Sequence, residues 1–186
     1  MRRRSLLIGA GVLAAAGVAL WSQRGRLLLQ PKEDVEQSRA LWPEGTVADR
    51  IEIHKAERLL SLQSGGRNFL NCHAALGFAP LGHKEREGDG RTPEGTYAID
   101  YKNDQSRFHL SLHIDYPRAA DRERAAELGV DPGGDIMIHG QPNGLKADPD
   151  QVLSGDWTLG CIAVSNGEME RIFAAVPLGC PVAICA

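Results

Sequence analysis

Residues 51–70 read IEIHKAERLLSLQSGGRNFL and hold the clearest strand and turn signals of the chain. Apolar and polar residues alternate in Ile51–Lys55 and again in Leu59–Leu62. Ser64-Gly65-Gly66 separates the second run from Phe69-Leu70, as a tight hairpin turn would. Because a period of two places one face of a strand against a core, this stretch predicts a β-hairpin at the start of a β-rich domain.

The rest of the chain repeats this texture of short strands and turns. Further strands are predicted at 72–78, 96–99, 107–115, 135–139, 161–164 and 182–185. Residues 82–95 form a loop, and helices are predicted at 119–128 and 148–153. Ser165 and Glu168 form a capping box that opens one more helix. The pattern predicts a mainly β domain, a sandwich or barrel with a few short helices.

Length and charge limit the class of protein. The 186 residues, 42% of them hydrophobic, fit one domain with a short leader. The net charge is −3, and because residues 1–30 hold only arginines among charged residues, the remainder is distinctly acidic. An acidic body argues against nucleic acid as a partner.

The N-terminus resembles a targeting segment. Arg2-Arg3-Arg4 precede an uncharged, apolar run from Ser5 to Trp21, which is typical of an export signal. An uncleaved membrane anchor formed by residues 5–21 is the alternative, and it would be the chain's only contact with a membrane. Both interpretations place the body in the periplasm or cell envelope. The predicted division is a leader at 1–26, a linker at 27–46 and a catalytic domain at 47–186.

Four cysteines, at positions 72, 161, 180 and 185, fall in an expected oxidising compartment. If Cys161 is a working thiol, at most one disulfide can form among Cys72, Cys180 and Cys185. The odd separation of Cys180 and Cys185 along a strand points them to opposite faces, so we expect buried thiols there. No Cys-x-x-Cys pair supports a zinc ribbon, and we expect neither a metal nor a cofactor.

Two short stretches are candidates for catalysis: Ile138-His139-Gly140 and the run TLGCIAV at 158–164. A thiol needs a base to become a nucleophile, and an acyl carbonyl under attack needs hydrogen-bond donors for its oxyanion. A histidine followed by glycine and a cysteine in a tight glycine turn can supply these parts. The alternative is a buried structural cysteine and an unrelated core histidine.

Strand alternation predicts which side chains accompany His139. In 107–115, Phe108, Leu110, Leu112 and Ile114 share one face, and His109, Ser111, His113 and Asp115 share the other. In 135–139, Asp135, Met137 and His139 share a face. If the two strands are neighbours, His113 approaches His139, and His113, Ser111 and Gly140 are the candidates for orienting the imidazole or binding substrate. A solvated strand face is the alternative.

The loop sequence GDGRTPEGTY at 88–97 is a second candidate for binding. Its glycines allow positive φ and Pro93 stiffens it, so it can line a cleft and offer Asp89 or Arg91 to a charged substrate. An ordinary surface connection is the alternative. The loop lacks the residues of a phosphate-binding loop.

These motifs carry a family resemblance. GDGRTPEGTY, then IHG, then the Thr-x-Gly-Cys-Ile block 22 positions after His139 resemble the L,D-transpeptidase catalytic domain (YkuD type) of bacterial envelope enzymes. The resemblance covers most of 47–186, and DWTLGCIAV at 156–164 is similar to one branch of the family. It implies a β-rich fold and acyl transfer at the L,D-peptide bond next to diaminopimelate in peptidoglycan stem peptides.

By position, the resemblance assigns Cys161 as nucleophile and His139 as proton acceptor and donor. Gly160 and the Cys161 backbone N–H would line the oxyanion site, with Thr158 in support. The sequence departs from the family at Leu159, where a histidine is usual, and at Ala163, where an arginine is usual.

The expected function is that of a peptidoglycan L,D-transpeptidase, and an envelope protein amine is a further candidate as acceptor or leaving group. The alternatives are a hydrolase of the same fold (an L,D-carboxypeptidase or amidase), a non-catalytic wall-binding module, and a zinc hydrolase built on His113, His139 and Cys161. Thiol trapping separates the enzyme from the binding module, and chelators separate it from the zinc hydrolase.

Overall fold

The fold is described from a computed structural model that covers residues 45–146 and 148–186. The predicted leader at 1–26 and nearly all of the linker at 27–46 lie outside the described residues. Among those described, no helix has both the length and the apolar character that crossing a bilayer requires. Export and anchoring therefore stay predictions.

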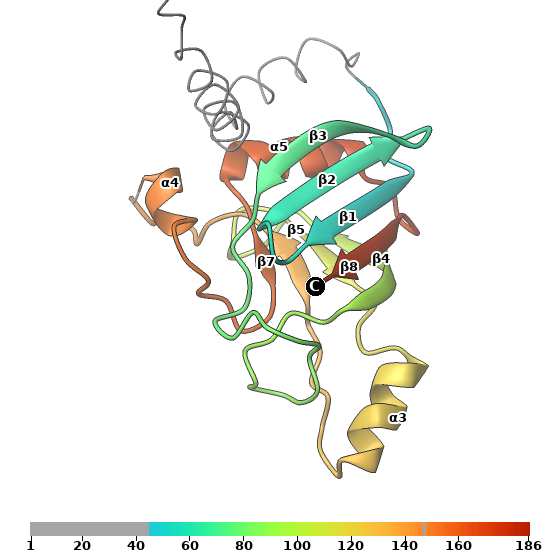
Figure 1. Cartoon of the computed structure of the whole chain (residues 1–186). Helices are drawn as coiled ribbons and strands as arrows, with labels where there is room; N and C mark the ends of the chain where they lie inside the picture. The colour runs from blue at the N-terminus through green and yellow to red at the C-terminus, as the bar shows by residue number, and fades with distance from the viewer. Residues whose placement is uncertain (1–44, 147) are drawn as a thin grey trace, which may run out of the picture.

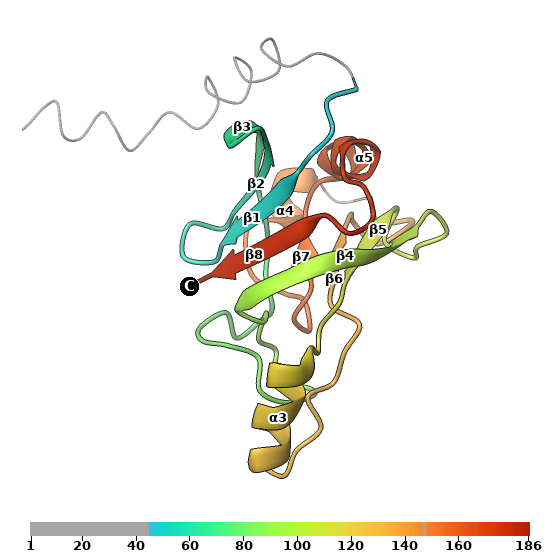
Figure 2. The ribbon, with the colours of Figure 1, turned by 90° about the vertical axis from the view of Figure 1, so that its right-hand side faces the viewer.

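Eight strands of the described residues form one curled sheet in the order β3-β2-β1-β8-β4-β5-β6-β7 (Figures 1 and 2). The strands are β1 (Arg50–His54), β2 (Leu59–Ser64), β3 (Arg67–His73), β4 (Gly95–Asn103), β5 (Ser111–Ile114), β6 (Met137–His139), β7 (Ile162–Ala163) and β8 (Pro181–Cys185). The helices are α3 (Ala119–Glu127), α4 (Pro149–Val152) and α5 (Asn166–Ala175). The predicted mainly β fold with a few short helices is confirmed.

The predicted hairpin is β2 and β3, which pair antiparallel. Gly65 and Gly66 connect them with φ of 59° and 74°, the backbone that a two-residue hairpin turn with right-handed strand twist requires. Ile51 and Leu60 point into the core, as the alternation predicts. Burying such aliphatic side chains stabilises the domain by about 1.5–3 kcal/mol each.

The two edges of the sheet meet because the chain after β3 runs beside β7. Ala75 donates its N–H to the carbonyl of Ala163 at 2.9 Å, and Ala163 donates back to Ala75 at 2.8 Å. Gly77 forms a second, parallel bridge to Thr158. The run at 72–78 is therefore not one strand, since β3 ends at His73 and only isolated bridges follow. These bridges bring the cysteine block against the first hairpin.

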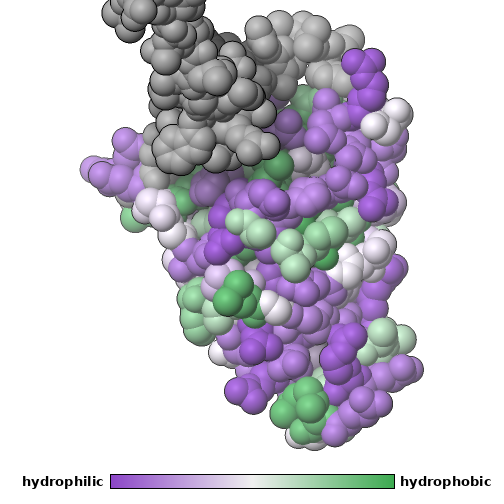
Figure 3. Space-filling view, in the orientation of Figure 1, coloured by the Kyte–Doolittle hydropathy of each residue, from purple (hydrophilic) through white to green (hydrophobic). Residues whose placement is uncertain are grey.

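Helix α5 covers the sheet on one side, and α3 projects from the opposite end of the domain (Figure 1). The capping box of α5 is present: Ser165 Oγ accepts the Glu168 N–H, and the Glu168 side chain returns to the Ser165 N–H. Met169 and Ile172 are fully buried on its inner face. The outer face shown in Figure 3 is predominantly hydrophilic, with small, separate hydrophobic patches.

Two predicted strands are shorter than the alternation indicates. β5 begins only at Ser111 because His109 has a φ of 68°, and β6 begins at Met137 because Asp135 has a φ of 54°. A residue in this left-handed region turns the chain, so alternation does not extend through it. The expectation of buried thiols at the C-terminus is wrong for Cys185, which is exposed; Cys180 is buried.

Candidate active site

Strands β6 and β7 bring the two catalytic candidates together. They pair in parallel, with Ile138 opposite Ile162 and His139 opposite Ala163. Cys161 directly precedes β7 and so lies beside Met137, one step diagonally from His139. On one face of paired strands such diagonal neighbours are roughly 7–8 Å apart, within reach of an imidazole. Two residues that are 22 positions apart in sequence are thus neighbours in the fold.

The His139 imidazole is buried and held in one tautomer. Its Nδ1 donates to the carbonyl oxygen of Gly140 at 2.7 Å, which leaves the lone pair on Nε2. Burial lowers the pKa of His139, and the Gly140 carbonyl only partly offsets this. A neutral imidazole with a free Nε2 lone pair is the form that accepts a proton at neutral pH.

Two aromatic rings that sequence reasoning missed fix the plane of the imidazole. The Phe108 ring centroid lies 4.6 Å from that of His139, and the Trp157 ring meets His139 edge-on at 5.9 Å. Phe108 was expected on the apolar core face, and this is wrong because the backbone turns at His109. Trp157 is part of the cysteine block, and its closeness to Cys161 in the sequence could have indicated that its ring lies near the site.

The Cys161 thiol lies over the beginning of β6. Its Sγ donates to the carbonyl oxygen of Asp135 at 3.4 Å. Burial raises the pKa of Cys161; the Met137 backbone N–H opposes the shift, Asp135 adds to it and Lys84 opposes it. The resting pair is therefore a neutral thiol and a neutral imidazole, and a reaction that used this pair would need the imidazole to take the thiol proton during attack.

Thr158 closes the turn that carries the thiol. Its Oγ1 donates to the Cys161 carbonyl at 2.7 Å and accepts the Gly160 N–H at 3.1 Å. Thr158 therefore ties together the backbone on both sides of Leu159 and Gly160. The Gly160 N–H is engaged by Thr158, so of the two backbone groups expected to line an oxyanion site, the Cys161 N–H is the remaining candidate donor.

Gly160 is needed for its backbone and its lack of a side chain. Its φ is 127°, and a Cβ there would come within 2.6 Å of the Arg91 carbonyl oxygen. The loop at 82–95 therefore packs directly behind the turn that carries Cys161. Thr92 of the same loop is buried and accepts the Gly77 N–H at 3.2 Å.

A buried lysine clamps this loop. Lys55 Nζ donates to the carbonyls of Gly82 at 2.6 Å and Thr92 at 3.0 Å, and to Glu94 Oε1 at 2.8 Å. These bonds hold both ends of the loop against the end of β1. Sequence reasoning missed Lys55 because a lysine after a strand normally points to solvent.

Asp89 organises the loop from within. Burial by itself would raise its pKa, but the backbone N–H groups of Glu85, Arg91 and Arg86 and the Lys84 ammonium lower it to about 2. Arg91 pairs with Glu85 at 3.1 Å. Both residues proposed for substrate binding are thus bonded within the loop; Asp89 is a structural anchor here.

Ser111 and His113 lie on the same strand as predicted, but they differ in what they contact. Ser111 is opposite His139 in register, and its buried Oγ has no hydrogen-bond partner in the described part of the chain. His113 does not orient His139: it is opposite Met137, and its Nδ1 bonds Asp100 at 2.6 Å. The Gly140 carbonyl takes the orienting place.

In the described ranges, no group of three or more His, Cys, Asp or Glu side chains is arranged to hold a metal ion. The zinc arrangement of His113, His139 and Cys161 has no counterpart there. The two departures from the family pattern differ in setting: the Leu159 side chain is 72% exposed, whereas Ala163 is buried against Ala75 and Leu153.

Comparison with known families matches residues 48–184 to the L,D-transpeptidase catalytic domain (YkuD). YafK of Escherichia coli (strain K12), which carries the name L,D-transpeptidase provisionally, is 31% identical over 132 residues, covering 68% of this chain and 46% of YafK. This chain thus spans about half the length of the curated relatives it matches.

Solved structures show the same fold. The helical cell shape determining protein Pgp2 of Campylobacter jejuni (K307A mutant) is 25% identical with a TM-score of 0.56, covering 77% of this chain and 48% of that one. Bd1075 of Bdellovibrio bacteriovorus is 21% identical with a TM-score of 0.52, covering 77% and 49%.

Proposed function

Because the chain belongs to the L,D-transpeptidase catalytic domain family, we propose that it is a cysteine-dependent L,D-transpeptidase acting on diaminopimelate-containing stem peptides of peptidoglycan. The observation that supports this most is the juxtaposition of Cys161 and a neutral, tautomer-fixed His139 on adjacent parallel strands. A base and a thiol so arranged suit acyl transfer through a thioester.

The proposed mechanism has two steps. His139 Nε2 takes the thiol proton as Sγ of Cys161 attacks the carbonyl carbon of the scissile amide. The Cys161 backbone N–H stabilises the developing oxyanion. The tetrahedral intermediate collapses to a thioester as the C–N bond breaks and His139 returns its proton to the leaving amine.

The acceptor decides the product. A second amine that attacks the thioester forms a new amide and frees the thiol, which gives a peptide crosslink or the attachment of an envelope protein. Water would give the L,D-carboxypeptidase or amidase reaction instead. Both reactions need the same nucleophile and base, so they are distinguished by their products.

The test follows product masses from a defined tetrapeptide, with and without an added amine. Wild-type protein should form a covalent acyl adduct at Cys161 and transfer it to the amine, whereas Cys161→Ala should do neither. Cys185→Ala, which removes an exposed thiol far along the chain, is the matched control and should behave as wild type. If Cys161→Ala turns over at the wild-type rate, the nucleophile is another residue.

Two further outcomes separate the alternative functions. Hydrolysed product alone, unaffected by amine, would assign the chain to the hydrolases. The absence of both an acyl adduct and any turnover of the tetrapeptide by the folded protein would identify a wall-binding module.

The proposal includes where the protein works. A stem-peptide substrate lies outside the cytoplasm, which agrees with the basic and apolar N-terminal segment at 1–26. Pgp2 is named for determining helical cell shape, and we extend to this chain a role in wall biogenesis that affects cell shape. Loss of the gene should then change cell form.

A further inference from the structure

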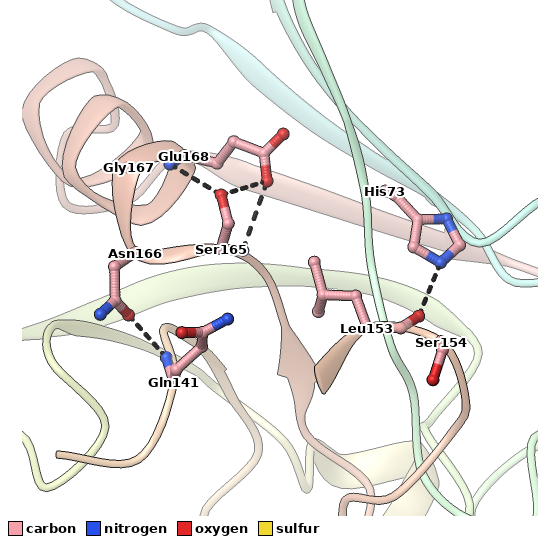
Figure 4. Close-up of a pocket in the computed structure, with 8 residues that line it drawn as sticks. All are labelled: His73, Gln141, Leu153, Ser154, Ser165, Asn166, Gly167 and Glu168. Carbon is pink, nitrogen blue, oxygen red and sulfur yellow. Dashed lines mark hydrogen bonds between the residues drawn. The ribbon is translucent and has the colours of Figure 1, made fainter. Parts of the chain in front are cut away.

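A cavity of about 600 Å³ opens beside the candidate active site (Figure 4). It lies where the end of β3, the end of α4 and the N-terminus of α5 meet. Its walls are formed by His73, Gln141, Leu153, Ser154, Ser165, Asn166, Gly167 and Glu168. The proposed mechanism uses none of these residues.

The cavity adjoins the catalytic pair through the chain itself. Gln141 follows His139 by two residues, and Ser165 follows Cys161 by four. Between them, the buried side chain of Ala163 contacts Leu153, which forms the apolar wall of the cavity. These links place the cavity at the carboxyl ends of β6 and β7, next to His139, whereas Cys161 precedes β7.

Gln141 contributes a hydrogen-bond donor that has no acceptor. The residue is only 6% exposed, and its Nε2 has no partner among the described residues. Its backbone N–H donates to Asn166 Oδ1 at 2.8 Å, which fixes the residue at the cavity wall (Figure 4). A buried donor without an acceptor is costly, and the terminal torsion of glutamine is soft enough to turn the amide towards a ligand.

Glu168 contributes an acceptor on the opposite wall. Its Oε2 accepts from Ser165 Oγ at 2.7 Å and from the Ser165 N–H at 3.3 Å. Both dashed lines in Figure 4 end on this one oxygen, and the second oxygen has no bond to any residue drawn. The carboxylate opposes the positive end of α5, so the cavity disfavours an anion.

A hydrogen-bond donor and a hydrogen-bond acceptor beside an apolar wall are complementary to a secondary amide that carries an alkyl group. We propose that the cavity binds a secondary amide, whose carbonyl oxygen accepts from Gln141 Nε2 and whose N–H donates to Glu168, with its alkyl end against Leu153. The identity of the polymer that carries the amide rests on the proposed function. Two parts of that polymer offer the group: the acetamido substituent of a sugar and the peptide bond.

The binding experiment uses the ¹⁵N-labelled full chain and follows the side-chain NH₂ signals of Gln141 by NMR. The probes are N-acetylglucosamine, N-acetylalanine methylamide and, as a control without an amide, glucose. We expect a saturable shift with at least one amide probe and none with glucose. The probe that shifts the signals identifies the source of the amide. Equal shifts with glucose, or none with either amide up to the solubility limit, would overturn the proposal.

Variants separate binding from folding. Gln141→Leu keeps the backbone bond to Asn166 and should weaken amide binding about tenfold, the usual effect of losing one hydrogen bond. Gln63→Leu on β2 makes the same change elsewhere and should bind as wild type. Gly167→Leu adds a side chain where a Cβ meets open space, so it should narrow the cavity and reduce binding without unfolding α5. Unchanged affinity in both Gln141→Leu and Gly167→Leu would refute the site.

Acylation of Cys161 by the tetrapeptide, measured by intact mass on the same samples, keeps the two proposals apart. Acylation without amide shifts refutes the cavity alone. Amide shifts without acylation refute the transpeptidase function while the amide site stands.

Discussion

At the scale of single residues, burial moves the pKa values of the two catalytic candidates apart. Burial raises the pKa of Cys161 above the ordinary thiol value of about 8.5 and lowers that of His139 below about 6.5. Between these values both groups are neutral. A cysteine enzyme with a preformed thiolate–imidazolium pair would have the opposite order.

This order predicts the pH dependence. Since His139 accepts a proton only when neutral, kcat/KM should fall as the pH drops through the lowered pKa of His139, below about 6.5. Direct alkylation of Cys161 by iodoacetamide should instead rise only above about pH 8.5, because the raised pKa keeps the thiol protonated. The measurement uses the Cys185→Ala background, so that an exposed thiol does not contribute. An alkylation plateau between pH 5 and 7 that His139→Gln abolishes would demonstrate an ion pair instead.

The sequence points to the two catalytic candidates more readily than to the residues that surround them. Cys161 and His139 stand out because each sits beside a glycine in a short apolar run. Phe108 and Trp157 were missed as the flanking rings because a ring contact depends on how distant segments cross, which no local pattern encodes. The expectation that His113 contacts His139 was wrong, because strand alternation shows which side chains share a face but not which of them are in contact.

At the scale of elements, the loop at 82–95 supports the turn that carries Cys161. Glycine, proline and charge predict a loop there, but they leave open whether it binds substrate or braces the fold. The bonds of Lys55, Asp89 and Thr92 all point inward. The loop is therefore held in place by its own bonds, as a preorganised oxyanion site at Cys161 would require.

Removing the clamp should loosen this support. We expect Lys55→Met to lower the free energy of unfolding by about 3 kcal/mol, since it removes a buried ammonium and leaves Glu94 and two carbonyls without their donor. Urea unfolding followed by circular dichroism measures this, with the exposed Lys146→Met as the control near zero. Acylation of Cys161 should slow as well, because Arg91 of the same loop contacts Gly160. Unchanged stability would show that the loop stands without its lysine.

Element ends were predicted less well than element types. The capping box predicts the start of α5 correctly, because both of its hydrogen bonds join Ser165 and Glu168, which are close in sequence. β5 and β6 start later than the alternation indicates because His109 and Asp135 adopt left-handed backbone, which non-glycine residues rarely do and which tertiary contacts impose.

At the scale of the whole molecule, the curl of the sheet brings the cysteine block next to the turn between β1 and β2. Arg58 lies in the turn between β1 and β2, and Asp156 precedes β7, the last strand in the sheet order. Arg58 Nη2 lies 2.7 Å from Asp156 Oδ2, and Asp156 Oδ1 also accepts the Leu76 N–H at 2.9 Å. This pair joins the turn between β1 and β2 to the start of the cysteine block, a contact between segments almost a hundred residues apart that the sequence did not reveal.

A double-mutant cycle on this pair tests whether Asp156 acts through the fold or in the chemistry. Arg58→Met and Asp156→Asn should each lower the free energy of unfolding by about 1–3 kcal/mol, as losing a partly buried charged hydrogen bond does, and the double variant should lose less than their sum. Both single variants should slow Cys161 acylation to a similar degree, because each releases the same edge of the sheet. The exposed Asp104→Asn is the control. If Asp156→Asn abolished acylation while Arg58→Met left it unchanged, the Asp156 carboxylate would have a role in the reaction itself.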